Sequence, residues 1–117
     1  MLQFFSPGVP QVYYVGLLVG TNDMELLRRT KEGRDFNRHH YTAQEIDLEV
    51  QRPVVRALFE LVRFRNTHPA FAADFNLLPC MDDQIVIEWR NKEHWARLNV
   101  DLKAMKSVID ASPEVLS

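Results

Sequence analysis

The sequence predicts an α+β chain, with helices in its first half and an antiparallel sheet in its second half. Apolar residues recur at helical spacing over residues 53–64, and a helix-capping motif precedes them. Between residues 84 and 102, apolar and polar residues alternate one by one, as they do in strands with one buried face. A third observation is a short strand-like run at residues 11–15, which has no obvious partner in the chain.

Residues 11–15, QVYYV, lie between Pro10 and Gly16. An uninterrupted run of apolar, β-branched and aromatic residues predicts a strand buried on both faces, which is typical of parallel sheets covered by helices. We find no second run of this kind in the 117 residues. The neighbours of this strand are therefore expected to be missing from the chain.

Residues 21–23 can cap a short helix that begins at Met24. The stretch 30–41 that follows is rich in hydrogen-bonding side chains and poor in aliphatic ones, which is typical of a solvated loop. The alternative is a binding loop beyond the end of the predicted strand, where α/β proteins build their sites. The candidate binding residues of such a loop are Gly33-Arg34-Asp35. The glycine permits a tight turn, the arginine presents a fork of hydrogen-bond donors, and the aspartate can orient the arginine.

Residues 42–66 are predicted to be helical. Thr42 and Glu45 have the spacing of a capping box, and Pro53 divides the segment and suits the first position of a second helix. Residues 66–69 end that helix. We expect it to be covered on most sides, because its polar stripe is narrow and consists of Arg56, Glu60 and Arg63.

The second half predicts a β-hairpin. Apolar residues occupy every second position in two runs, with the residues between them expected to face outward. The first run is Ile85, Ile87 and Trp89, and the second is Ala96, Leu98, Val100 and Leu102. The turn falls at residues 91–93. Residues 75–78 and 107–109 are weaker strands that can flank the hairpin.

The composition argues against several classes of function. Fourteen Lys and Arg against sixteen Asp and Glu give a net charge of −2, so the basic excess of a nucleic-acid binder is missing. The longest apolar run is residues 12–19, much shorter than the roughly 20 residues of a membrane span, and the start lacks the basic region of a signal peptide. We expect neither nucleic acid nor a membrane as partner, and the single cysteine suits a reducing compartment, the cytoplasm.

The remaining reactive side chains have structural interpretations. Asp82 and Asp83 suit a turn, and Cys80 has no histidine expected to converge on it, so we interpret it as inert. The four histidines and the cysteine lack metal-ligand spacing, and the four glycines form no phosphate-binding loop. The sequence predicts no metal site and no cofactor.

Three segments carry a resemblance to a known family. They are residues 5–16, FSPGVPQVYYVG, residues 17–41, which end in GRDFNRHHY, and residues 52–55 and 64–71, RPVV and FRNTHPAF. Together they resemble the sucrose phosphorylase branch of glycoside hydrolase family 13, the α-amylase superfamily. The resemblance implies a (β/α)₈ TIM barrel followed by a small antiparallel β-domain. On this basis, residues 1–69 are the end of the barrel, with strand eight, its active-site loop and the final helices, and 70–117 are the β-domain.

The resemblance also implies an activity. In this family one carboxylate attacks the anomeric carbon and a second acts as acid and base, so the reaction retains configuration. Sucrose, or a similar α-glucoside, and inorganic phosphate give α-glucose 1-phosphate and fructose. The carboxylates belong to earlier barrel strands, so we expect no catalytic residue in this chain and no activity of the chain alone. We expect Met1 to be an internal methionine of a full-length parent. Whether that parent dimerises stays open.

One substrate-binding residue follows from the resemblance. Arg34 matches the arginine that hydrogen-bonds the glucosyl hydroxyls next to the cleaved bond, with Tyr14, Asn37 and Arg38 in supporting positions. Phe36 and His40 depart from the Ile and Tyr that are usual in the resemblance, which leaves the acceptor open. The alternatives are a phosphorylase of the same branch acting on sucrose 6-phosphate or glucosylglycerate, and a non-catalytic sugar-binding or interaction module.

Overall fold

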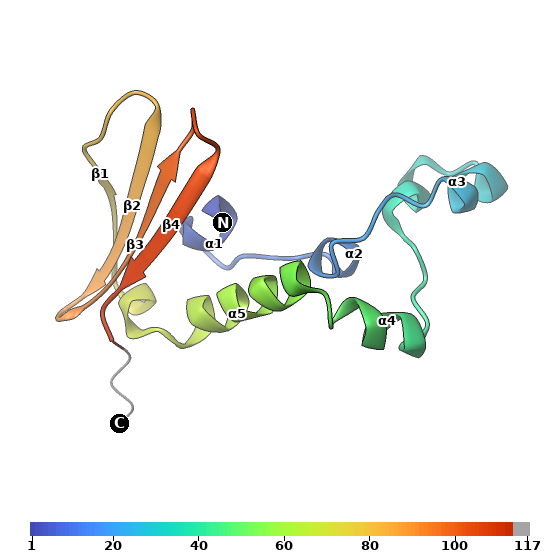
Figure 1. Ribbon diagram of the computed structural model, residues 1–117, viewed down its shortest axis with the longest axis horizontal. Coiled ribbons are helices and arrows are strands. Elements are labelled where there is room, and N and C mark those ends of the chain that lie inside the picture. Colours follow the sequence, from blue (N-terminus) through green and yellow to red (C-terminus); the bar gives the residue numbers. More distant parts are fainter. Residues whose placement is uncertain (114–117) are drawn as a thin grey trace. The chain divides into compact units, whose positions relative to one another are not determined.

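The computed structural model describes residues 1–113, and they divide into two compact units (Figure 1). The first unit joins Met1–Pro10 to the described residues from Leu61 onward, and the second is Gln11–Glu60. Helix α5 (Pro53–Thr67) contributes its first half to the second unit and its second half to the first. No helix among residues 1–113 is both long and apolar enough to cross a membrane.

A four-stranded antiparallel sheet in the order β1-β2-β3-β4 forms the first unit. Its strands are β1 (Asp74–Leu78), β2 (Gln84–Asn91), β3 (His94–Asp101) and β4 (Lys106–Ala111). The predicted hairpin and both flanking strands are thus confirmed. Ile87 pairs with Leu98, and Trp89 with Ala96, so the alternation in the sequence places these residues on one face.

That face carries the core of the first unit. Around it lie α1 (Leu2–Phe5), the end of α5 and a 3₁₀ turn, η2 (Pro69–Ala72). The buried cluster consists of Phe5, Ala70, Ile87, Trp89, Ala96 and Leu98. The indole Nε1–H of Trp89 donates to the carbonyl of Phe5 over 2.7 Å, so the N-terminal helix is tied to the sheet by a directed bond as well as by packing.

His68 joins the end of α5 to the end of β4. It is 3% exposed, its Nδ1 accepts from the Ala70 amide at 3.3 Å, and its Nε2 lies 2.9 Å from the carbonyl of Ser112. A carbonyl can only accept, so Nε2 carries the proton and the ring is held as one neutral tautomer. This histidine therefore has a structural role.

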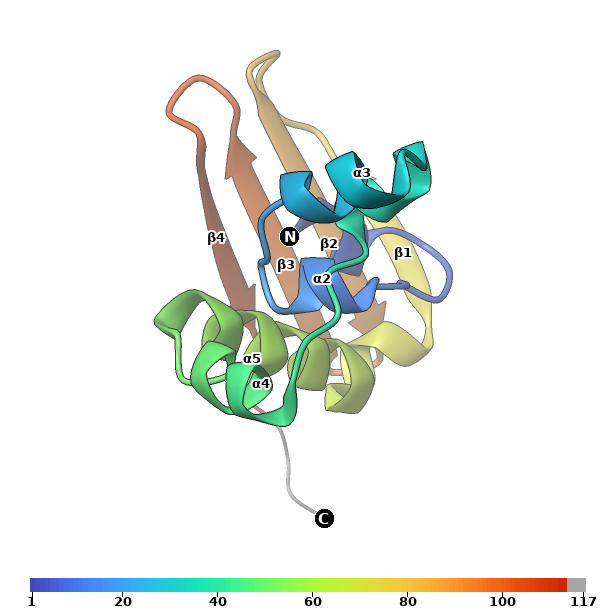
Figure 2. The same cartoon turned by 90° about the vertical axis from the view of Figure 1, so that its right-hand side faces the viewer.

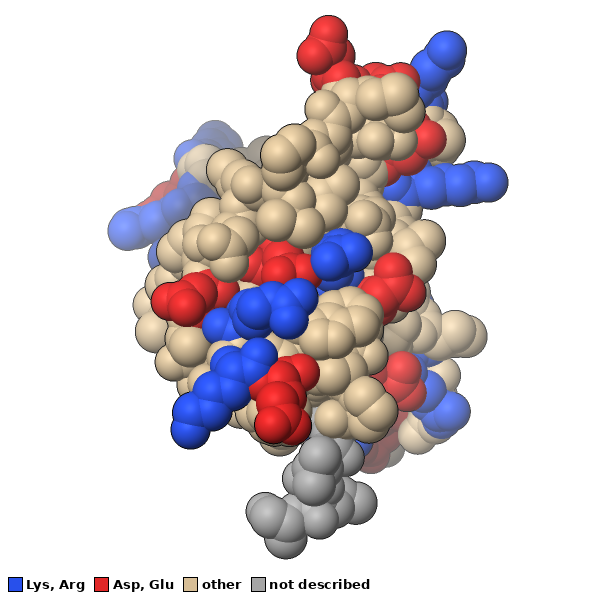
Figure 3. All heavy atoms as spheres, turned by 90° about the vertical axis from the view of Figure 1, so that its left-hand side faces the viewer, with Lys and Arg blue, Asp and Glu red and all other residues tan. Residues whose placement is uncertain are grey.

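The opposite face of the sheet is charged, and Figure 3 shows Lys and Arg side chains mixed with Asp and Glu on the side of the molecule where the sheet lies. Glu88 is buried there, with Oε1 2.8 Å from Arg90 Nε and Oε2 2.7 Å from Arg97 Nη2. Arg97 is the cross-strand partner of Glu88. The carboxylate is therefore compensated from both sides.

Short helices form the second unit, and they are drawn from blue to green in Figure 2. They are α2 (Tyr14–Leu17), α3 (Met24–Thr30), the 3₁₀ turn η1 (Gly33–Asn37), α4 (Ala43–Glu49) and the first half of α5. Both predicted caps are confirmed, because Asp23 caps α3 and Thr42 forms a capping box with Glu45 on α4. Pro53 begins α5, as predicted.

The predicted strand at residues 11–15 is wrong. Residues 11–13 have no regular structure, and Tyr14–Leu17 is helical. The amide of Leu17 donates to the carbonyl of Tyr13 at 2.8 Å, and that of Leu18 to Tyr14 at 3.1 Å. A strand needs a neighbour to pair its backbone groups, whereas a helical turn satisfies them locally. With no parallel neighbour among the described residues, the local solution is the one adopted.

The expectation that α5 is covered on most sides is also wrong for the described residues. Val55 is fully buried, but Val54 is 48% exposed and Phe59 is 38% exposed. Within the described part of the chain, Val55 is the one buried residue of α5, and Leu61 and Phe64 are partly buried against the core of the first unit. The helix therefore has more apolar surface than residues 1–113 cover.

Candidate functional site

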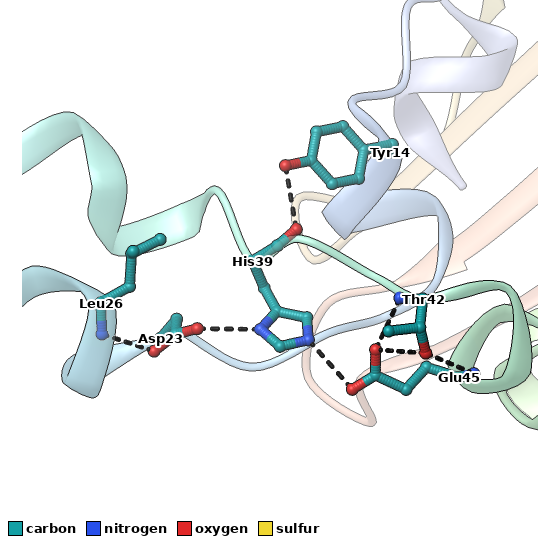
Figure 4. A network of polar contacts seen from close by, with 6 residues as sticks. All are labelled: Tyr14, Asp23, Leu26, His39, Thr42 and Glu45. Carbon is teal, nitrogen blue, oxygen red and sulfur yellow. Dashed lines mark hydrogen bonds and ion pairs between the residues drawn. The ribbon is translucent and has the colours of Figure 1, made fainter.

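The second unit gathers polar side chains around His39, as Figure 4 shows. The ring Nδ1 lies 2.8 Å from Asp23 Oδ2, and Nε2 lies 3.4 Å from Glu45 Oε1. The backbone carbonyl of His39 accepts from the Tyr14 hydroxyl at 3.0 Å. One residue thus contacts side chains from α2, from the start of α3 and from α4.

Helix capping explains why both carboxylates lie there. Asp23 Oδ1 accepts from the amide of Leu26 at 2.8 Å, which leaves Oδ2 for the histidine. Glu45 Oε2 accepts from the amide of Thr42 at 2.7 Å and from its hydroxyl at 2.9 Å, which leaves Oε1 for the histidine. Each carboxylate divides its two oxygens between a helix N-terminus and the imidazole.

These contacts shift the pKa of all three groups toward their charged forms. The hydrogen bond to Asp23 raises the pKa of His39, with Glu45 adding to it against the effect of burial. The hydrogen bond from His39 lowers the pKa of Asp23, and the Thr42 backbone N–H lowers that of Glu45. The arrangement favours an imidazolium between two ionised carboxylates.

A pocket of about 630 Å³ adjoins this cluster, in the size range of small-molecule sites. Its polar lining includes Asn22, Asp23, His39, Tyr41, Glu45, Glu49 and Arg52. Burial, followed by the nearby Glu49 and Glu45, raises the pKa of Tyr41, so its hydroxyl stays protonated. Donors and acceptors that surround such a space can bind hydroxyl groups or bridging water.

Gly20 lies against Tyr41 on one wall of this pocket. A Cβ atom at residue 20 would overlap the Tyr41 hydroxyl. The glycine is therefore required for the close approach of the tyrosine to the backbone.

The predicted site residues are only partly brought together. Arg34 lies on η1 with its side chain 69% exposed, and its Nε is 2.9 Å from Glu32 Oε2. Asn37 and Arg38 are also exposed, and these three residues do not line the pocket at His39. Tyr14 does join the cluster, through its bond to the His39 carbonyl.

Sequence reasoning missed His39. A signal was present, because the predicted caps Asp23 and Glu45 each offer a second oxygen, and His39 stands between them in the sequence. Among residues 1–113, no three His, Cys, Asp or Glu side chains are grouped as metal ligands. Cys80 is exposed, with its Sγ 3.2 Å from the Gln84 carbonyl, and Asp82 and Asp83 lie in the turn before β2.

Comparison with known proteins adds the deciding observation. The chain is 49% identical over 109 residues to a sucrose 6(F)-phosphate phosphorylase of Thermoanaerobacterium thermosaccharolyticum, which covers 93% of the chain and 22% of that protein. It is 50% identical over 111 residues to a sucrose phosphorylase of Agrobacterium vitis, covering 95% of the chain and 23% of that protein. The chain is homologous to the C-terminal region of sucrose phosphorylases of glycoside hydrolase family 13.

Two further relatives agree with this assignment. A glucosylglycerol phosphorylase of Marinobacter adhaerens is 46% identical over 101 residues, which covers 86% of the chain and 21% of that protein. A crystal structure of sucrose 6F-phosphate phosphorylase from Thermoanaerobacter thermosaccharolyticum matches with a TM-score of 0.93 at 48% identity, over 97% of this chain and 23% of that one. The chain thus spans less than a quarter of the length of these sucrose phosphorylase relatives. No family model matches it.

Proposed function

We propose that the chain is part of a retaining glycoside phosphorylase, a glucosyltransferase that converts sucrose and phosphate to α-glucose 1-phosphate and fructose. The supporting observation is the 49–50% identity to phosphorylases over more than nine tenths of the chain. In the full-length protein, residues 1–69 complete a (β/α)₈ barrel and residues 70–117 form the C-terminal β-domain. The protein works in the cytoplasm, as a monomer or a homodimer.

In this proposal the chain binds sugar and supplies no reacting group. A carboxylate outside these residues displaces fructose from the anomeric carbon, while a second carboxylic acid protonates the departing oxygen. Phosphate then attacks the anomeric carbon from the face that fructose left, gives a proton to the second carboxylate, and releases α-glucose 1-phosphate and the free nucleophilic carboxylate. Arg34 donates to the glucosyl hydroxyls, for which its exposed guanidinium, on a turn held by Glu32, is suited.

The acceptor is the finer part of the proposal. The relatives carry the names of sucrose, sucrose 6(F)-phosphate and glucosylglycerol phosphorylases at similar identities, from 46% to 50%. We place sucrose first. Sucrose 6-phosphate and glucosylglycerate are the alternatives within the branch.

The test is phosphate-dependent release of glucose 1-phosphate by the full-length protein, with sucrose, sucrose 6-phosphate, glucosylglycerol and glucosylglycerate compared at equal concentration. Arg34→Ala is expected to lower kcat/KM by about tenfold to a hundredfold, because a charged hydrogen bond to the sugar is lost. Arg29→Ala, on α3, is the matched control. Wild-type kinetics in the Arg34 variant would remove this residue from the site.

The 117-residue chain alone separates the proposal from a binding module. We expect no turnover from it, because both carboxylates are outside the chain. Turnover by the 117 residues would refute this assignment. If the full-length protein cleaved none of the four glucosides, while the chain alone melted cooperatively and sedimented as one species, the non-catalytic module would replace the enzyme.

A further inference from the structure

The loop between α3 and α4 is fixed at two places. Near its middle, the amide of Asp23 donates to the carbonyl of Phe36 at 2.8 Å. Near its end, the ring of His39 contacts Asp23 at 2.8 Å and Glu45 at 3.4 Å. The first tie is made within the turn η1, which carries Arg34, and the second lies two residues after that turn ends. A change at His39 therefore acts on the segment that presents Arg34.

Donor counting shows which form of His39 can make both ring contacts. A neutral imidazole has one N–H, whereas ionised carboxylates only accept. Two carboxylates therefore need the two N–H groups of an imidazolium. When the proton is lost, the shorter contact to Asp23 keeps the remaining N–H, and the ring lone pair then faces Glu45, which weakens that side of the bridge.

Other charged and titratable groups lie near the ring. Tyr14 of α2 bonds the His39 carbonyl, and Tyr41 packs edge-on against the ring with centroids 4.6 Å apart. Glu25 of α3 and Glu49 of α4 line the same pocket, as does Arg52, which is ion-paired with Glu49. Four carboxylates thus face this space against one guanidinium.

We infer that His39 is a positioning residue: as an imidazolium it bridges the caps of α3 and α4, and its deprotonation releases the loop that carries Arg34. The link to sugar binding rests on the proposed function of Arg34. The bridge itself rests on the contacts of His39 alone.

Amide variants separate the bridge from the helix caps. Asparagine still caps a helix and glutamine still closes a capping box, so Asp23→Asn and Glu45→Gln keep α3 and α4 while removing the charge that faces the ring. His39→Gln removes the imidazole, and His40→Gln is the matched control on the neighbouring exposed residue. All four variants are made in the full-length protein.

Hydrogen exchange measured by mass spectrometry tests the bridge. Protection factors of peptides covering residues 31–41 are compared at about pH 5 and about pH 9, on either side of the usual histidine range. In the wild type and in His40→Gln we expect protection to fall by up to about fivefold at the higher pH, the range for an exposed ion pair. In Asp23→Asn, Glu45→Gln and His39→Gln we expect the dependence on pH to be lost. Equal protection at both pH values in the wild type, or the same behaviour of the two histidine variants, would overturn the bridge.

Exchange at the imidazole C2 position gives an independent reading, with fragmentation that separates His39 from His40. The pKa of His39 is expected to fall in Asp23→Asn and Glu45→Gln, and an unchanged value in both would refute the bridge. In kinetics, the KM for sucrose should rise with pH in the wild type, and it should be raised at both pH values in His39→Gln. An inactive protein would remove the proposed function, whereas the exchange data would still decide the bridge.

Discussion

Replacing Trp89 by phenylalanine tests how the N-terminal segment is held on the sheet. Trp89 is 7% exposed, donates to the Phe5 carbonyl at 2.7 Å, and packs against Phe71 and Phe75 with centroids 5.8 and 5.4 Å away. Phenylalanine leaves that buried carbonyl unpaired, at a cost of about 1–3 kcal/mol, and removes ring volume for about 1–2 kcal/mol more. We expect a total loss of about 2–5 kcal/mol in the free energy of unfolding.

The second tryptophan supplies a matched control. Trp95 lies on β3 opposite Arg90, half-buried on the charged face, with Arg97 5.5 Å from its ring. Trp95→Phe should cost no more than about 1 kcal/mol. The assay is urea unfolding followed by circular dichroism. A loss below about 0.5 kcal/mol in Trp89→Phe would refute the claim that this bond anchors the N-terminal helix.

Three further changes have defined outcomes. Thr42→Ala removes one side of the capping box and should lower the free energy of unfolding by about 1 kcal/mol. The loss should be seen as reduced helix content and a lower unfolding midpoint, and an unchanged midpoint would count against the cap. The hydrogen bond from Arg90, and after it that from Arg97, holds the pKa of Glu88 below its usual value. The ionised Glu88 therefore stabilises the fold above the pKa of the unfolded state, near 4.5, and this stabilisation is lost as the pH falls through the lower pKa of the folded state. Glu88→Gln should abolish that acid dependence, and an identical pH profile of the unfolding midpoint would contradict it. Gly20→Ala should displace the Tyr41 ring, seen as greater tyrosine exposure to solvent by second-derivative absorbance, whereas an unperturbed spectrum would contradict the close approach.

The parts of the fold that depend on local patterns could be predicted from the sequence. The hairpin follows from alternation between neighbouring residues, and the capping box from the spacing of Thr42 and Glu45. The run at residues 11–15 had the composition of a strand, but a strand is defined by its pairing partners, which composition does not supply. Local pattern therefore predicted the caps and the hairpin, and it failed for a strand whose partner is not among the described residues.

The candidate site shows the same limit. Arg34 was singled out first as part of Gly33-Arg34-Asp35 and then through a resemblance. The structure places it on an exposed turn, and it does not line the pocket at His39. His39 was missed because its role depends on two caps 16 and 6 residues away in sequence, which meet only in space. Each cap was predictable by itself, whereas their convergence on one ring was not.

The hydrogen bond between Trp89 and Phe5 cannot form until late in the synthesis of this region on the ribosome. Its two ends are 84 residues apart in sequence. At about 5–20 residues per second, Phe5 waits roughly 4–17 s before Trp89 has even been synthesised. During that interval, the apolar segment Leu2–Phe5 has neither its hydrogen-bond donor nor the sheet face that buries it. Chaperones that bind short apolar stretches have this window in which to act, and it closes when the β2–β3 hairpin forms.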